Sequence, residues 1–198
     1  MDYAHSNPDA GVRPRASEVV IQAGPGAAYL VGPGARSRAG GHHSLGDRDH
    51  TKFNGPTHVL AKTTKSVMAP TMGAGVGALF MGAQPLTGYR QTLLEMGHPQ
   101  PATHIRIDNK SAHGVLTGIM GQGRTKPPDV GANWVKGRCG QGQFTIGWAP
   151  GETNLAGYPT KHHTGLHHRQ VRPIQLYVGG KSPTTLQGCN KILDPKMG

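Results

Sequence analysis

Glycine and proline are the residues that most limit what this chain can fold into. The sequence has 31 glycines and 16 prolines among 198 residues, and only 35% of its residues are hydrophobic. Glycine loses more conformational entropy on folding than any other residue, and proline lacks the N–H that a helix or sheet interior needs. We therefore expect one domain of ordinary size with a thin core. An unselected open reading frame that does not fold stably is an alternative that this composition leaves open.

Short apolar segments between turn signals predict the strands of an α/β fold. The first segment, Glu18 to Ala23, is rich in β-branched residues, and we expect the Gly24-Pro25-Gly26 turn signal to end it. Asn54-Gly55-Pro56 is a second turn signal of this kind. In total we expect five strands, at residues 18–23, 38–45, 58–62, 103–108 and 143–148.

Helical periodicity begins at residue 71 and predicts a long helix over residues 71–97. One face carries Met72, Val76, Leu79, Phe80 and Ala83, and beyond Pro85, which should break or kink the helix, it continues through Tyr89, Leu93, Leu94 and Met96. The glycines inside this helix cost about 1 kcal/mol each relative to alanine, at Gly73, Gly75, Gly77 and Gly82. Ser111 is expected to cap a short helix ending at Met120 and Asp129 to cap another, and residues 152–163 form a last helical stretch interrupted at Pro159.

The charge balance favours a polyanionic partner. Lysine and arginine number 21 against 10 aspartates and glutamates, a formal charge of +11, and the basic residues are scattered along the chain. Such a surface suits nucleic acid, so a basic nucleic-acid-binding protein in its own right is a second hypothesis. Cys139 and Cys189 are too few for a disulfide framework or a four-cysteine zinc site. With no apolar run of 18 residues and no signal-peptide pattern, we expect an intracellular protein, cytoplasmic or nuclear, without a membrane partner or a small-molecule substrate.

Several short segments, in the right order, carry a resemblance to a known family. Gly26-Ala27-Ala28-Tyr29-Leu30 looks like that family's Asp-Ala-Ser-Tyr-Leu, Ile107-Asp108-Asn109 is similar to its Thr-Asp-Asn, and Asn154-Leu155-Ala156-Gly157-Tyr158 resembles its Asn-Leu-Ala-Asp-Tyr. Ala35 to His42, Glu95 to Pro101, Thr160 to His163 and His167 to Pro173 extend the match. The chain thus resembles the ribonuclease H-like domain of copia-type LTR retrotransposon polyproteins, the part associated with their reverse transcriptase.

The resemblance implies an α/β fold with a ribonuclease H-like mixed five-stranded sheet flanked by helices. It covers residues 18–175. Residues 1–17 are expected to be a disordered N-terminal tail, and residues 176–198 form a C-terminal tail that matches nothing.

The same resemblance implies metal-dependent hydrolysis of an RNA–DNA hybrid by four carboxylates that hold two Mg²⁺ ions. Three of the four expected positions are glycine here, namely Gly26, Gly75 and Gly157, and Gly73 stands where the family has a neighbouring Glu. Asp108 is the sole surviving carboxylate and a weak metal candidate. Because one carboxylate cannot hold two divalent ions against water, we expect a degenerate, catalytically inactive copy that needs no cofactor. Mg²⁺ would be implied only by an intact ancestral site.

Other potential ligands and nucleophiles argue less for a site. His162, His163, His167 and His168 have spacings that could bind Zn²⁺ or Ni²⁺, but they also resemble ordinary family sequence, and no cysteine or carboxylate lies nearby in the sequence. His42-His43 is a weaker candidate still, and Asp47, Asp49 and Glu152 read as solvated loop acids. Nothing in the sequence around Cys139 supports a nucleophile.

What remains is binding to an RNA–DNA hybrid or to RNA, expected to be weak. A ribonuclease H-like sheet contacts such a duplex along its backbone through basic side chains and amides. The candidate residues are Arg36, Arg38, Lys62, Lys65, Arg124, Lys126, Lys136 and Arg138. If several act together, affinity should fall steeply with salt.

Overall fold

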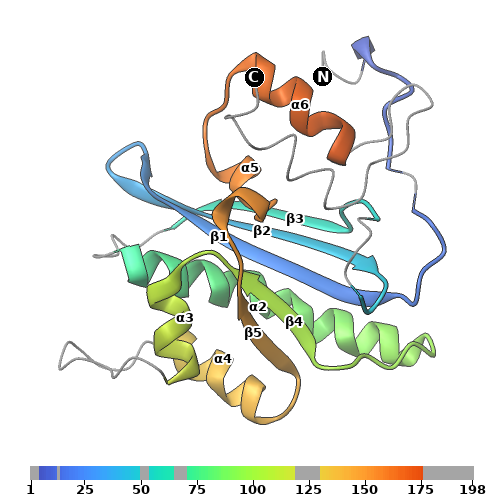
Figure 1. Cartoon of the computed structure of the whole chain (residues 1–198), viewed down its shortest axis with the longest axis vertical. Helices are drawn as coiled ribbons and strands as arrows, with labels where there is room; N and C mark the ends of the chain where they lie inside the picture. Colours follow the sequence, from blue (N-terminus) through green and yellow to red (C-terminus); the bar gives the residue numbers. More distant parts are fainter. Residues whose placement is uncertain (1–4, 13, 50–53, 65–70, 119–129, 176–198) are drawn as a thin grey trace.

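A mixed five-stranded sheet forms the centre of the computed structural model, which describes residues 5–12, 14–49, 54–64, 71–118 and 130–175 (Figure 1). Its strands are β1 (Val20–Gly32), β2 (Arg36–Gly46), β3 (His58–Thr63), β4 (Thr103–Ile107) and β5 (Phe144–Trp148). The order is β3-β2-β1-β4-β5. The pairs β1–β2 and β2–β3 are antiparallel, and β1–β4 and β4–β5 are parallel. This is a ribonuclease H-like α/β sheet, so the predicted fold class is confirmed.

Helices cover both faces of the sheet (Figure 1). One face packs against α2 (Thr71–Glu95), with α3 (Lys110–Thr117) and α4 (Val130–Gly140) beside it, and the other faces α5 (Gly157–Thr160) and α6 (Gly165–Gln175). Neighbouring residues of β2 show the two sides: a Cβ at Gly40 would meet Thr160 and Ala156, whereas one at Gly41 would lie 3.7 Å from Gly82 of α2. The apolar core lies on the α2 face and includes Ile21, Leu79, Leu86, Ile105 and Phe144. In the described ranges no helix is both long enough and apolar enough to span a membrane.

Strand β1 runs through the sequence that was predicted to end it. Gly24, Pro25 and Gly26 pair with His42, Gly41 and Gly40 in the middle of the β1–β2 ladder. Glycine inside a strand often marks close approach of another segment, and that is the case here. A Cβ at Gly26 would lie 3.0 Å from Asn154 Nδ2, and one at Gly82 of α2 would lie 2.8 Å from Pro25 Cβ. Small residues at this place let both layers pack closely on the strand.

Pro85 was expected to break or kink the long helix, and helix α2 continues through it without a break. Val76, Leu79, Ala83, Leu86 and Leu93 are buried at spacings of three, four and seven residues along one face. Leu94 and Met96, predicted to continue that face, are 54% and 66% exposed. The helix keeps its register past the proline, so the buried face falls on Leu93, and Leu94 points away from it.

The last helical stretch is divided differently from the prediction. In place of one helical stretch over residues 152–163, the structure has a short 3-10 turn, η1 (Gly151–Thr153), followed by the single turn α5. A separate helix, α6, follows from Gly165. Pro159 lies in the first turn of α5, where a missing N–H costs nothing, so it does not interrupt that helix.

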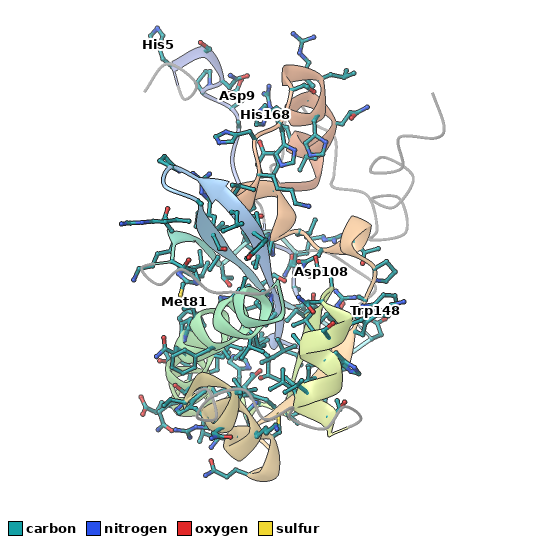
Figure 2. The ribbon with its side chains drawn as sticks, turned by 90° about the vertical axis from the view of Figure 1, so that its left-hand side faces the viewer. His5, Asp9, Met81, Asp108, Trp148 and His168 are labelled. Atoms are coloured by element: carbon teal, nitrogen blue, oxygen red, sulfur yellow. The ribbon has the colours of Figure 1, made fainter. Side chains whose placement is uncertain are left out.

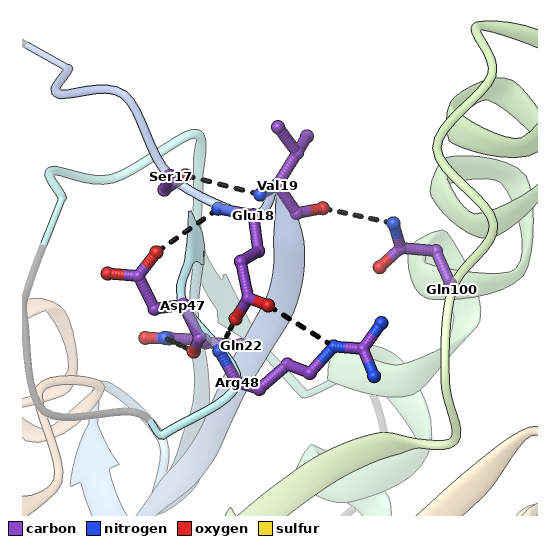
Figure 3. Close-up of polar contacts among 7 residues, drawn as sticks. All are labelled: Ser17, Glu18, Val19, Gln22, Asp47, Arg48 and Gln100. Atoms are coloured by element: carbon purple, nitrogen blue, oxygen red, sulfur yellow. Dashed lines mark hydrogen bonds and ion pairs between the residues drawn. The ribbon is translucent and has the colours of Figure 1, made fainter.

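Hydrogen bonds and an ion pair connect the start of β1 to the end of β2 and to Gln100 (Figure 3). Gln100 accepts a hydrogen bond from the Ile21 N–H at 3.0 Å and donates one to the Val19 carbonyl at 3.0 Å. Asp47 accepts from the Glu18 N–H at 3.1 Å, and Glu18 pairs with Arg48 at 3.5 Å. Asp47, interpreted from sequence as a solvated loop acid, thus has a structural contact at this end of the sheet.

Candidate functional site

Three of the four positions expected to carry carboxylates meet at one cavity. Gly26 on β1, Gly75 on α2 and Asp108 directly after β4 all line a space of about 230 Å³. Its other lining residues are Pro25, Ala27, Tyr29, Ala74, Ile107 and Asn109. Three positions that are far apart in the sequence therefore lie together at one cavity, as the resemblance implies for carboxylates that share a metal site.

The fourth position, Gly157, is not among the lining residues of this cavity. It begins α5, directly after Ala156, whose Cβ would lie 3.3 Å from a Cβ at Gly26. A Cβ at Gly157 itself would have no other heavy atom within 4 Å. The start of α5 thus lies next to the Gly26 side of the cavity, with open space at Gly157.

Two asparagines occupy the space beside the missing side chains, and sequence analysis missed both. A Cβ at Gly75 would lie 2.7 Å from Asn109 Nδ2, and a Cβ at Gly26 would lie 3.0 Å from Asn154 Nδ2. A replacement of Gly75 or Gly26 by a carboxylate residue would therefore have to displace an asparagine. A turn-forming asparagine next to an expected ligand position is the signal that could have indicated them.

Both asparagines make local hydrogen bonds of their own. Asn109 caps α3 by accepting from the Ala112 N–H at 2.9 Å, so the predicted cap at Ser111 is wrong. The cap falls there because Asn109 has the extended backbone of an N-cap residue, whereas Ser111 already lies within the helix. Asn154 donates to the Pro25 carbonyl at 3.0 Å and accepts from the Ala156 N–H at 3.1 Å.

Among the described residues that line this cavity, Asp108 is therefore the one carboxylate. Its backbone carbonyl accepts a hydrogen bond from Trp148 Nε1 at 3.0 Å, and Lys110 Nζ lies 4.7 Å from the centre of the Trp148 ring. Figure 2 shows Asp108 and Trp148 on the same side of the molecule. Across the described residues, no group of three or more His, Cys, Asp and Glu side chains could hold a metal ion. Since Mg²⁺ requires oxygen ligands, these residues do not fit the metal pair that the family implies.

The histidines of the C-terminal segment stack on one another rather than converge on a point. The rings of His163 and His167 lie 4.0 Å apart at 15°, and Tyr158 OH is 2.6 Å from His168 Nδ1. Burial, together with the neighbouring His163 and His168, lowers the pKa of His167. The face-to-face contact of His163 and His167 is a packing arrangement.

The candidate nucleic-acid-binding residues fall into two groups at opposite edges of the sheet. Arg36 and Arg38 lie on β2 and Lys62 on the edge strand β3, whereas Lys136 and Arg138 lie on α4, which packs against α2 and β5. Arg138 donates to Gln143 Oε1 at 3.2 Å and covers the Trp134 ring at 5.1 Å. Lys65, Arg124 and Lys126 lie outside the described residues, as do Asp129 and Cys189.

Cys139 is half-buried in α4, and burial raises the pKa of its thiol. A raised pKa reduces the thiolate fraction at neutral pH. This cysteine packs against the core, which agrees with the absence of a nucleophile pattern in the sequence.

Comparison with known proteins finds likeness only at the level of three-dimensional structure. No family model matches the chain, and no curated protein matches it. Among solved structures, ribonuclease H1 LC11 in complex with an RNA/DNA hybrid is 14% identical, with a TM-score of 0.48 over 68% of this chain and 88% of that one. The N-terminal ribonuclease H domain of a Mycobacterium tuberculosis protein is 15% identical, with a TM-score of 0.43 over 72% and 94%. Ribonuclease H1 from Halobacterium salinarum is 15% identical, with a TM-score of 0.40 over 69% and 90%.

These similarities are distant, and the fold assignment rests on the strand order and strand directions described above.

Proposed function

We propose that this chain is a catalytically inactive ribonuclease H-like domain, derived from a copia-type retrotransposon polyprotein, that retains weak binding to an RNA–DNA hybrid or to RNA. The observation that carries the proposal is the shared cavity of Gly26, Gly75 and Asp108, because it offers one carboxylate where two-metal hydrolysis needs several. The retroelement origin rests on the order of the sequence segments that resemble that family.

Inactivity follows from the ligand chemistry. Two metal ions about 4 Å apart carry a combined charge of +4, and carboxylates must neutralise much of it before the phosphate enters. Asn109 and Asn154 supply neutral amides, whose oxygens already accept backbone hydrogen bonds. The cavity therefore lacks the charge and the free ligand atoms for this chemistry.

Nucleic-acid binding is supported by the net charge of +11 and by the basic residues Arg36 and Arg38 on β2 and Lys62 on β3. Arg38 pairs in register with Ala28, two residues from Gly26 along β1, so it lies on the strand next to the cavity wall. Lys62 pairs with Ala39 on the following strand. Both residues lie on the β3 side of the cavity, Arg38 on the α5 face and Lys62 on the α2 face, whereas Lys136 on α4 lies towards the β5 edge.

The test measures cleavage and binding on the same preparation. A labelled RNA–DNA hybrid is incubated with Mg²⁺ or Mn²⁺, and we expect no cleavage above that of an Asp108→Asn variant. Metal-dependent cleavage that Asp108→Asn abolishes would overturn the proposal. Binding of the hybrid is followed by fluorescence anisotropy over a salt series, and weak binding should fall steeply as salt rises.

The second hypothesis, a basic nucleic-acid-binding protein in its own right, makes a different prediction in the same assay. Sub-micromolar affinity at physiological salt would favour it over a remnant with generic charge. Lys62→Gln should then weaken binding more than the matched variant Lys136→Gln at the other edge. A cooperative thermal melt of the purified chain tests the remaining alternative, a sequence that does not fold stably.

A further inference from the structure

A second, smaller cavity lies on the sheet face that α5 covers, and its walls are polar. It has a volume of about 40 Å³, and the polar side chains that the strands contribute are Gln22, His42, Ser44 and Arg106. Segment 149–155 closes it with Ala149, Thr153, Asn154 and Leu155. A cavity needs about 10–15 Å³ to hold one water on the same measure, so the space suits a few waters or one small ion.

Three of these polar side chains are almost fully buried, and all come from β1 and β2. Gln22, His42 and Ser44 are 6%, 5% and 3% exposed. The described residues that line the cavity include no aspartate or glutamate. The cavity is therefore a buried polar site with a cation and without a compensating acid.

That cation is Arg106, which is half-buried in the middle of β4. Within the described ranges, its guanidinium has neither a carboxylate partner nor a hydrogen-bond acceptor in the protein, and its burial lowers its pKa. Burying an unpaired charge is costly, and arginine cannot avoid the cost by losing its proton. An anion in the cavity would offset that cost.

The other polar groups leave few donors available for such an anion. Gln22 Nε2 donates to the Asp47 carbonyl at 3.1 Å, and Asn154 is held at Pro25 and Ala156. Ser44 Oγ makes only a long contact of 3.5 Å with Gln22 Oε1, so its hydroxyl can turn to a better acceptor. Arg106 and Ser44 are thus the donors that remain for a ligand.

We propose that this cavity binds a tetrahedral oxyanion of the phosphate class, with Arg106 as the principal ligand and Ser44 as a hydroxyl donor. Arginine forms two parallel charge-assisted hydrogen bonds to such an anion. The small volume suits inorganic phosphate or a phosphate at the end of a nucleic-acid strand, and it excludes the backbone of a duplex. The site stands apart from hybrid binding, so failure of either proposal leaves the other intact.

The test is a titration with inorganic phosphate at constant ionic strength, with chloride as the comparison salt, followed by calorimetry and by thermal melting. Wild type should bind phosphate and melt at a higher temperature in its presence. Arg106→Gln should weaken binding about tenfold or more, as expected for loss of charge-assisted hydrogen bonds. The matched variant Arg169→Gln removes an exposed arginine from α6, away from the cavity lining, and should stay within about twofold.

Three further measurements keep the result interpretable. Arg106→Gln should melt cooperatively without phosphate, and Ser44→Ala should weaken phosphate binding by a smaller factor than Arg106→Gln. A 5′-phosphorylated oligonucleotide compared with its 5′-hydroxyl form separates the two sources of the anion. A benefit from the 5′-phosphate identifies a strand end, whereas binding of inorganic phosphate alone identifies the free anion. No effect of either, or equal weakening by Arg106→Gln and Arg169→Gln, would overturn the proposal.

Discussion

Each face of the sheet carries a basic side chain, one buried and one half-buried, and the two differ in whether the side chain is charged. On the α2 face, His43 is 1% exposed, and burial followed by the nearby His58 and His42 lowers its pKa to about 4. It is therefore neutral at neutral pH, with its Nδ1 3.0 Å from His58 Nδ1. On the α5 face, Arg106 keeps its charge and opens onto a polar cavity. A buried imidazole can lose its proton and become neutral, whereas a buried guanidinium stays charged and needs an anion or water to offset its charge.

The two faces also differ in the space they leave for a carboxylate side chain introduced at the glycine positions. Gly75 on α2 lies against Asn109, whereas Gly157 at the start of α5 has open space. The α2 side is closed by packing, and the start of α5 is not. The following predictions test these contrasts.

The largest effect is expected from Gly75→Glu. The new side chain must displace Asn109, so the α3 cap is lost at about 1 kcal/mol and overpacking adds about 1–3 kcal/mol. We expect the free energy of unfolding in urea to fall by about 2–4 kcal/mol. The matched change Gly157→Asp should alter it by less than about 0.5 kcal/mol, since it enters open space at a helix start. Equal effects of the two changes would contradict the contrast between the faces.

A pH effect of comparable size should come from His43. Its folded-state pKa of about 4 is below the ordinary value of 6.5, so between these values the unfolded chain binds more protons and stability rises with pH. The contribution is fully present above about pH 6.5 and is lost as pH falls towards 4, by about 3 kcal/mol at most. Urea melts from pH 4 to 7 measure it. His43→Phe should flatten this dependence, and an unchanged slope would show that His43 is not its source.

A smaller effect separates two possible caps of α3. Asn109→Ala should lower the free energy of unfolding by about 1 kcal/mol because the Ala112 N–H loses its acceptor. Ser111→Ala, at the position that the sequence suggested, should change it by less than about 0.5 kcal/mol, because Ser111 is exposed within the helix. The reverse order of effects in urea melts would restore Ser111 as the cap.

The smallest effect is expected from Arg106→Met in phosphate-free buffer. Methionine keeps much of the side-chain length and removes the unpaired charge, so stability should stay within about 1 kcal/mol of wild type or rise. Thermal melts in chloride buffer measure it. A loss of more than about 3 kcal/mol would mean that Arg106 has a partner in the folded chain.

Sequence periodicity predicted the positions of all five strands and the start of the long helix, because apolar spacing depends on near neighbours. It failed at Pro25, which was expected to end the first strand, and Pro85, which was expected to break or kink the long helix, does not end that helix. Whether a proline is tolerated depends on what packs around it. At Pro25, the close approach of Gly82 and Asn154 supports an extended strand that the local sequence did not indicate.

The candidate site, like the fold, was predicted from the sequence only in part. The absence of carboxylates at Gly26, Gly75 and Gly157 was evident from the sequence once its segments were matched to the family. Asn109, Asn154 and Arg106 were not identified as site residues, because none of them stands at a position where a ligand was expected. Their roles depend on distances to residues elsewhere in the chain, such as the 129 positions that separate Asn154 from Pro25.

By itself, the sequence determined most of the order of helices and strands, the excess positive charge and the presence of glycine at three positions where the resemblance implies metal ligands. These properties depend on residue identity and on short-range spacing, both of which can be read along the chain. Only the tertiary structure decided that Gly26, Gly75 and Asp108 share a cavity and that asparagines lie beside the glycines at the expected carboxylate positions. It also decided that Arg106 is half-buried with no aspartate or glutamate among the described residues that line its cavity. Burial and pairing are properties of groups brought together across the sheet, and spacing along one strand does not specify them.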